Sequence, residues 1–290
     1  MDFKVNSSDL LKAISHIHGV VEIRHTLPIL SNMIITAKDG RLKLCSTNLD
    51  IYCSDQVNAE IVSPGEISVS ASTFHEIIKR LPNGSDLHAT LDEESSSLIL
   101  KCGRSKFNLT TMKTDDFPTI ADSDLDTNFV LSAAELIRMI DKTKFAISNE
   151  ETRYFLNGLY FNVTNEDNKN IVTLVGTDGH RLAKFSQEIN ENIEVVSGVI
   201  IPKKTIYELS KLLSEFDDDV NISISSNKIV FIVGDIIFVS KLIDGSFPDY
   251  KRVIPNDNKN ILKINRDKLL SAVDRVSTIA NDKSPVIKFK

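Results

Sequence analysis

The run most suggestive of chemistry is Thr177-Asp178-Gly179-His180-Arg181-Leu182, which places a carboxylate next but one to an imidazole. An aspartate and a histidine at this spacing could serve as a general acid and base. The run lies between two predicted strands, however, where an Asp-Gly pair is common in turns. Thr47-Asn48-Leu49-Asp50 occupies the matching place earlier in the chain. This repetition favours a structural role, and an enzyme that uses Asp178 and His180 remains the alternative.

Other catalytic and metal-binding patterns are missing from the sequence. It contains no GxxxxGK[ST] phosphate loop, no GxSxG elbow and no HExxH helix. His16 and His18 point in different directions on a predicted helix, which disfavours a shared metal. Cys45, Cys53 and Cys102 are odd in number and lack CxxC spacing, which indicates reduced thiols. We therefore expect no catalytic residues, no metal and no cofactor.

The composition is that of a cytoplasmic globular protein. Of the 290 residues, 41% are hydrophobic and 26% are charged. No apolar run approaches the ~20 residues of a membrane-spanning helix. The first residues, Met1 to Val5, lack the basic-then-apolar order of a signal peptide.

The elements that carry these residues follow one order repeatedly. A strand, a helix and three strands are predicted within 2–61, with the three strands near 29–37, 41–46 and 51–61. The same order recurs within 66–112, within 128–187, where the first strand after the helix is expected at 154–163, and within 198–242. The connections are short, so the strands should form antiparallel meanders. A further copy begins with a strand at 260–264 and a helix from Asn265, and a last strand is predicted from Val286 to Phe289.

Matching side chains show that pairs of these units form larger repeats. Leu10-Leu11, Leu136-Ile137 and Leu269-Leu270 occupy the same helix position, at spacings of 126 and 133 residues. A period of about 130 residues is too long for a solenoid, so each copy should be a domain. The prediction is an α+β fold whose helices pack on antiparallel sheets. The predicted domains are 1–125, 126–255 and an incomplete third domain at 256–290.

The net charge of −6 is unevenly distributed. The five predicted helical windows together carry +4, which leaves −10 for the strands and loops. This segregation suits a basic helical face that meets phosphates, with an acidic surface elsewhere. The alternative is that solvated helix faces are commonly rich in Lys and Arg.

Three further clusters could bind ligands. Arg24 precedes His25-Thr26-Leu27-Pro28-Ile29-Leu30, and Arg153-Tyr154-Phe155-Leu156-Asn157-Gly158 holds the equivalent place in the second repeat. A cation, or a cation with aromatics, beside a helix end can hold a phosphate or a base plane, although it can also be a packing aromatic with a solvated arginine. The linker Phe247 to Val253 could form the floor of a groove between domains.

Four of the runs above and Gly103-Arg104-Ser105-Lys106-Phe107, taken in chain order, resemble the bacterial DNA polymerase III beta subunit family of sliding clamps. The resemblance covers essentially the whole chain. It is carried by Thr26-Leu27-Pro28-Ile29-Leu30, Gly103-Arg104-Ser105-Lys106-Phe107, Arg153-Tyr154-Phe155-Leu156-Asn157-Gly158, Thr177-Asp178-Gly179-His180-Arg181-Leu182 and Phe247-Pro248-Asp249-Tyr250.

The resemblance implies the DNA clamp fold and a non-enzymatic processivity factor. Two three-domain subunits would close head to tail into a ring, with helices lining the hole and sheets outside. The implied partners are double-stranded DNA of any sequence, the replicative DNA polymerase, the clamp loader, other proteins with clamp-binding motifs, and a second clamp subunit. An adaptor that keeps only the peptide groove and forms no ring is a further alternative.

The resemblance also assigns residues to three sites. Those near DNA are Arg24, Arg153 and Tyr154. Those of a peptide groove between domains two and three are Phe155, Leu156, Thr177, Gly179, His180, Arg181, Leu182, Pro248, Arg252 and Val253. Those of the subunit contact are Ile77, Arg104, Lys106, Phe107, Leu109, Thr278 and Ile279.

The sequence departs from this family's pattern at several places. Glu150 stands where relatives often carry a neutral polar residue facing DNA, which should weaken that contact. Ser284-Pro285 replaces a more usual arginine, and the sequence holds only the start of a third domain. We expect two folded domains and a labile tail with Leu269, Leu270, Val273 and Val276 exposed or loosely docked. Such a chain should not close into a dimeric ring, should tend to aggregate, and should be trimmed by proteases near 255–265.

Overall fold

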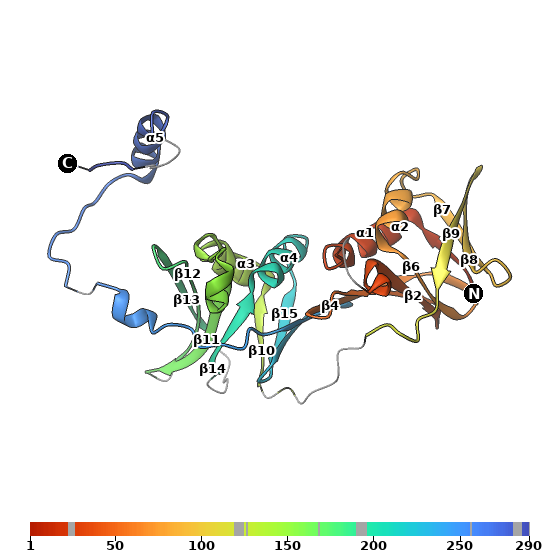
Figure 1. The fold of residues 1–290 in the computed structure, drawn as a ribbon, viewed down its shortest axis with the longest axis horizontal. Helices are drawn as coiled ribbons and strands as arrows, with labels where there is room; N and C mark the ends of the chain where they lie inside the picture. Colours follow the sequence, from red (N-terminus) through yellow and green to blue (C-terminus); the bar gives the residue numbers. More distant parts are fainter. Residues whose placement is uncertain are drawn as a thin grey trace. The chain divides into compact units, whose positions relative to one another are not determined.

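The computed structural model describes residues 1–22, 27–118, 125, 127–167, 169–189, 196–255, 257–280 and 286–289. They form two compact units, Met1–Phe247 and Pro248–Lys290. The first unit contains two repeats, which we call repeat one (residues 1–118) and repeat two (residues 127–247). The expected α+β architecture with antiparallel sheets is confirmed, and Figure 1 shows the elements.

Repeat one contains the two predicted units of a strand, a helix and three strands. The first has one additional strand, β5, and a short 3-10 helix, η1. In chain order the elements are β1 (Asp2–Asn6), α1 (Ser7–His18), η1 (Pro28–Ser31), β2 (Asn32–Lys38), β3 (Arg41–Thr47), β4 (Ile51–Asn58), β5 (Glu60–Ser63), β6 (Gly65–Ser70), α2 (Ala71–Lys79), β7 (Asp86–Asp92), β8 (Ser97–Cys102) and β9 (Ser105–Met112).

Repeat two has the same order, with two 3-10 helices after its first α-helix. The elements are β10 (Thr127–Ser132), α3 (Ala133–Asp141), η2 (Lys144–Ala146), η3 (Glu151–Leu156), β11 (Gly158–Glu166), β12 (Lys169–Thr177), β13 (Leu182–Ile189), β14 (Val196–Pro202), α4 (Lys203–Leu213), β15 (Asp219–Ile224), β16 (Lys228–Val233) and β17 (Ile236–Lys241).

The helices begin where local chemistry predicts. The Ser132 side chain accepts a hydrogen bond from the Glu135 N–H at 3.3 Å, and Glu135 reaches back to the Ser132 N–H at 3.4 Å. This is the capping box that the sequence Ser132-Ala133-Ala134-Glu135 predicts. Asn6 caps α1 by accepting from the Ser8 N–H at 2.9 Å. Capping satisfies backbone N–H groups that have no partner within the helix, so it fixes the first residue of each helix.

Two strands begin later than the sequence suggests. Pro28 opens η1, and β2 begins only at Asn32, because proline has no N–H to donate to a sheet. The residues before Gly158 form η3, so β11 also starts late. The predicted strand at 51–61 is divided into β4 and β5.

The second unit differs from expectation at two segments. It contains η4 (Tyr250–Val253) and α5 (Arg266–Ser277), which Asn265 caps by accepting from the Lys268 N–H at 3.1 Å. The strands predicted at 260–264 and 286–289 do not form. A strand requires hydrogen bonds to a neighbouring strand, and the described part of this unit offers none. Leu270 is 64% exposed and Val276 is 50% exposed, while Leu269 and Val273 are half-buried.

Both repeats bury one face of their helices against their sheets. Figure 1 shows α1 with α2, and α3 with α4, as two pairs that cover the same side of their strands. The apolar core is continuous through the first unit, and its largest buried side chains include Phe3, Phe74, Phe161, Phe231 and Phe238. Burying an aliphatic or phenylalanine side chain contributes about 1.5–3 kcal/mol, so this shared core stabilises both repeats together.

A pair of antiparallel strands joins the two repeats. β17 of repeat two pairs with β4 of repeat one, with Phe238 opposite Cys53 and Ser240 opposite Ile51. The two half-sheets thereby become one sheet that runs from β10 to β5, while β11 to β14 form a separate four-stranded sheet. The ion pairs Lys241–Asp50, at 3.4 Å, and Arg41–Asp235, at 3.3 Å, also link the repeats.

Phe238→Ala should therefore destabilise both repeats at once. The side chain is 1% exposed, and its truncation should lower the free energy of unfolding by about 3–5 kcal/mol. Urea unfolding followed by circular dichroism should show a single transition at a lower midpoint. Val62→Ala, at a position that is 59% exposed, is the control and should change little. Two separate transitions, of which only one moves, would contradict the shared core.

Candidate functional site

The Thr177–Leu182 run forms a tight turn between β12 and β13. The Thr177 hydroxyl donates to the Arg181 carbonyl at 2.7 Å and accepts from the Gly179 N–H at 3.1 Å. Asp178 Oδ1 accepts from the N–H groups of His180, at 2.9 Å, and Arg181, at 3.0 Å. The His180 and Arg181 N–H groups hold the pKa of Asp178 below its ordinary value, and the Arg181 guanidinium adds to the shift. The carboxylate thus serves the turn, which argues against a proton-transfer role.

Repeat one builds the same turn with different residues. Thr47 donates to the Ile51 carbonyl at 2.8 Å and accepts from the Leu49 N–H at 3.1 Å. Asn48 Oδ1 accepts from the N–H groups of Asp50, at 3.2 Å, and Ile51, at 2.8 Å. The third position has positive φ in both turns, 78° at Leu49 and 88° at Gly179. The structural role predicted for this place in both repeats is thus supported by its hydrogen bonds.

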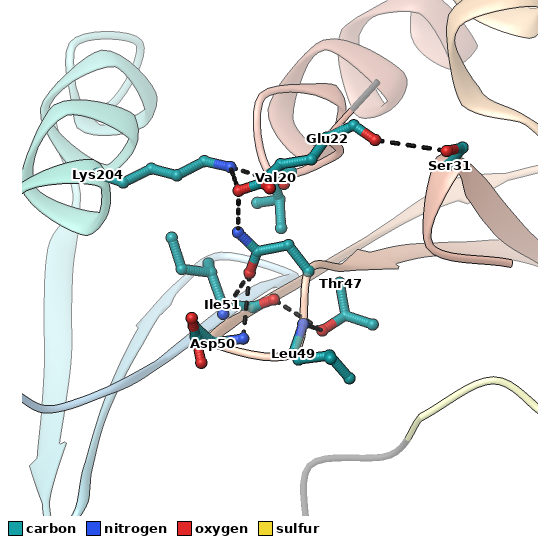
Figure 2. Close-up of polar contacts among 9 residues, drawn as sticks. Val20, Glu22, Ser31, Thr47, Leu49, Asp50, Ile51 and Lys204 are labelled. Atoms are coloured by element: carbon teal, nitrogen blue, oxygen red, sulfur yellow. Dashed lines mark hydrogen bonds and ion pairs between the residues drawn. The ribbon is translucent and has the colours of Figure 1, made fainter. Parts of the chain in front are cut away.

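The turn of repeat one is fastened to repeat two, as Figure 2 shows. Lys204, near the start of α4, donates to Glu22 Oε1 at 2.7 Å and to the Val20 carbonyl at 3.2 Å. Asn48 Nδ2 donates to the same Glu22 oxygen at 3.0 Å. Lys204 and Glu22 are 36% and 44% exposed, so solvent screens this pair and its contribution to stability is small. Together, the hydrogen bonds of Lys204 and Asn48 to Glu22 define the position of this turn relative to α4.

The turn of repeat two lies at the surface. Gly179, His180 and Arg181 are exposed, Leu182 is half-buried, and the Arg181 guanidinium lies 5.7 Å from the centre of the Phe145 ring. Phe145, in η2, is 54% exposed and was missed by sequence analysis. The sequence offered one indication of Phe145: it is an aromatic residue that follows Lys142 and Lys144 at the polar end of a predicted helix. Of the other predicted groove residues in this unit, Phe155 is half-buried and Leu156 is 3% exposed.

The remaining predicted groove residues belong to the second unit. Pro248 is exposed, and Arg252 and Val253 lie in η4, where Val253 is 68% exposed. Asp249 caps η4 by accepting from the Lys251 N–H at 3.3 Å and pairs with Arg252 at 2.9 Å. An exposed apolar side chain on a short rigid turn is suited to contact a ligand.

Two of the predicted DNA contacts, Arg153 and Tyr154, lie in η3. Tyr154 is 54% exposed, and its ring meets that of Phe155 edge to face at 5.7 Å. Arg153 Nε donates to Glu150 Oε2 at 2.7 Å, so the arginine charge is partly neutralised. Arg24 lies outside the described residues. The exposed aromatic and the paired cation form a surface that could meet a base plane or a phosphate.

The helix layer carries further cations. Lys144 and Lys203 each place Nζ 5.7 Å from the centre of the Tyr207 ring, on α4. His18 of α1 stacks on His75 of α2 with ring centres 4.5 Å apart. Burial lowers the pKa of His18 below its ordinary value, and Lys211 adds to the shift. Burial likewise lowers the pKa of His75, with His18 as the next cause. Sequence analysis missed Tyr207 and His75 because their partners are distant in the chain.

Five residues of the predicted subunit contact belong to repeat one, and the other two belong to the second unit. Ile77 and Phe107 line a groove of about 510 Å³ together with Arg80, Leu81 and Pro82. Arg104 and Lys106 are exposed, whereas Leu109 is 5% exposed and belongs to the core. In the second unit, Thr278 caps the end of α5 and Ile279 is 88% exposed.

The described residues contain neither a metal-binding cluster nor a membrane-spanning helix. No group of three His, Cys, Asp or Glu side chains is placed to hold a metal ion there. Cys45, Cys53 and Cys102 are free thiols, and burial raises the pKa of Cys45 to about 11. None of the helices in the described part of the chain is long and apolar enough to cross a bilayer.

Comparison with known proteins gives consistent matches along the chain. The family model of the DNA polymerase III beta subunit N-terminal domain matches residues 1–121, and that of the central domain matches residues 130–249. The beta sliding clamp of Caulobacter vibrioides strain NA1000 is 42% identical over 289 residues, covering 100% of this chain and 78% of that protein. The beta sliding clamp of Escherichia coli strain K12 is 36% identical over 284 residues, covering 98% of this chain and 76% of that protein.

A solved structure agrees with these sequence matches. Caulobacter crescentus pol III beta superposes with a TM-score of 0.92 at 42% identity, covering 97% of this chain and 76% of that one. At this identity, the likeness extends beyond the fold to the family.

The stacked histidines should make stability depend on pH. Both pKa values are lowered in the folded chain, so the unfolded chain binds more protons once the pH falls toward the ordinary histidine value of about 6.5. The melting temperature should therefore fall between pH 7.5 and pH 5.5, and it should fall less in His18→Gln/His75→Gln. His180→Gln, at an exposed imidazole, is the control. Equal pH dependence in the wild type and the double variant would refute this role.

Proposed function

This chain belongs to the bacterial DNA polymerase III beta subunit family, and we propose that it acts as a sliding clamp, a subunit of a ring that encircles duplex DNA. It would act in the cytoplasm at the replicating chromosome, without enzymatic turnover or a cofactor. A closed ring needs only weak contacts to phosphates, because leaving a long DNA requires opening the ring.

The observation that carries this proposal is the pairing of β17 with β4. It joins the two repeats through one sheet and leaves both helix pairs on the same side of their strands. If further repeats were joined by the same strand pairing, the repeats would form an arc with the sheets on the outside and the helices on the inside. We propose domains at 1–125 and 126–255, with 256–290 as the start of a third.

Duplex DNA would meet the helix side through charge and not through base contacts. Lys144 and Lys203 lie on that side, and Arg24, Arg153 and Tyr154 would extend the surface from neighbouring loops. Contacts to phosphates do not read the base edges, so binding should not depend on sequence.

Protein partners would bind by a short peptide. The turn at Gly179, with Phe155, Leu156, Thr177, His180, Arg181 and Leu182, would form one wall, and Pro248, Arg252 and Val253 would contribute from the second unit. The peptides would come from the replicative polymerase, the clamp loader and other clamp-binding proteins. Gly179, at φ 88°, has no side chain, so a main chain could approach the turn closely once the Arg153 guanidinium moves aside.

Where the third domain is complete, a second subunit would meet repeat one. Ile77 and Phe107 offer an apolar groove, and Arg104 and Lys106 offer charge at its edge. Thr278 and Ile279 of a neighbouring chain would supply the other side. Leu109 would support this surface from the core, since its own side chain is buried.

Arg24→Ala with Arg153→Ala should weaken duplex binding equally for all sequences. Each lost phosphate contact should lower the slope of log K against log salt by about 0.9. Fluorescence anisotropy with several duplexes over a range of salt measures both quantities, and Lys38→Ala, at an exposed lysine outside these loops, is the control. A preference of more than a few-fold among duplexes would contradict the proposed mode of binding.

Gly179→Arg should abolish peptide binding. The new side chain would fill the space above the turn, and we expect at least a tenfold loss of affinity for an extended peptide with apolar anchors and a glutamine near its start. Gly40→Arg is the matched control, because Gly40 has a similar φ of 76° and open space around it. Calorimetry that finds equal affinity in the two variants would move the site elsewhere.

A further inference from the structure

Arg153 is tied to Glu150 through both its main chain and its side chain. The Arg153 N–H donates to the Glu150 carbonyl at 3.3 Å, and the guanidinium approaches Glu150 Oε2 at 2.7 Å through both Nε and Nη2. The Glu150 N–H in turn donates to Ser148 Oγ at 3.1 Å. The loop is closed by the Ser148 N–H, which donates to the Leu156 carbonyl at 3.1 Å. Glu150 is thus well placed to control where the guanidinium lies.

The guanidinium lies against Gly179, in the turn between β12 and β13. A Cβ built on Gly179 would come within 2.6 Å of Arg153 Nη1. The arginine head group therefore occupies the space that the missing side chain leaves free. The turn itself is held by the hydrogen bonds of Thr177 and Asp178, so the arginine is the part that can move. The Arg153 side chain is 34% exposed, which leaves it a path away from the turn.

We propose that Arg153 couples the peptide site to the DNA site, and that Glu150 sets the strength of this coupling. Held by Glu150, Arg153 covers Gly179 and its charge is neutralised. A peptide main chain that lies over Gly179 displaces the guanidinium, and a DNA phosphate that attracts the guanidinium uncovers Gly179. Both ligands favour the same displaced state, so each tightens the binding of the other by the same factor. This inference rests on the proposed function, since it requires both ligands.

The size of the effect follows from the exposure of the pair. Glu150 is 54% exposed, and an ion pair of this kind contributes little, so either ligand can break it. We expect coupling of about two- to fivefold. Glu150 thus has two effects: its negative charge weakens the contact with DNA, and its ion pair restrains Arg153.

The chain supplies a matched control for the charge of Glu150. Glu151 is the next residue, is also exposed, and forms no ion pair among the described residues. Glu150→Gln and Glu151→Gln remove the same charge at nearly the same place. Only the first should release Arg153.

The test is a double-mutant cycle on the full chain with two probes, a fluorescent duplex and a synthetic extended peptide with apolar anchors and a glutamine. In the wild type, saturating peptide should tighten duplex binding about two- to fivefold. Glu150→Gln should tighten duplex binding more than Glu151→Gln does, and this excess should vanish in an Arg153→Ala background. An excess that persists without Arg153, or equal effects of the two glutamate variants, would overturn the proposal.

A second readout needs neither ligand. The rate at which phenylglyoxal modifies Arg153, followed by mass spectrometry of the digested chain, should rise in Glu150→Gln and stay unchanged in Glu151→Gln. Equal rates in all variants would show that Glu150 does not hold the guanidinium. If neither probe bound any variant while the modification rates differed as expected, the proposed function would fail and the restraint on Arg153 would stand without its coupling role.

Discussion

The pairing of β17 with β4 is the constraint on which the rest of the first unit depends. Backbone hydrogen bonds between the repeats, with Phe238 opposite Cys53, fix the twist and register of one half-sheet against the other. Side chains alternate between the two faces of a strand, so a shift by one residue would turn Phe238 out of the core. The joint therefore determines both the shared core and the side on which all four helices lie. The surface ion pairs around it add little by comparison.

One turn, built twice, serves two purposes. In repeat one, Asn48 and Glu22 connect it to Lys204 of the neighbouring repeat, so the turn is used for assembly (Figure 2). In repeat two, Asp178 pairs with Arg181 instead, and Gly179 is left at the surface. The same backbone hydrogen bonds hold both turns. The two turns differ in that the second residue is an asparagine in one and an aspartate in the other, and in that the first turn is linked through Glu22 to Lys204 of α4.

The charges suit a protein that holds DNA loosely. Lys203 lies at the start of α4 and Lys144 lies near it, paired with Asp141 at 2.7 Å, while the chain as a whole carries −6. Such contacts are long-range, weak and indifferent to sequence, and they allow sliding once a ring provides the topological link. The restraint of Arg153 by Glu150 fits this balance, because a contact that is partly neutralised can respond to a second ligand without holding the DNA tightly.

Local structure and its repetition follow from the amino-acid sequence alone. Capping residues such as Ser132 and Asn265, helical periodicity and the spacing of the leucine pairs depend only on near neighbours in the chain, and they predicted the order of elements within the first unit. The predicted strands at 260–264 and 286–289 did not form, because a strand depends on a partner that local sequence cannot supply. The burial of Leu109, the exposure of Phe145 and the contact of Arg153 with Gly179 arise from packing between distant segments. Only the tertiary structure could decide them, since one residue's neighbours in space are set by the fold of the whole unit.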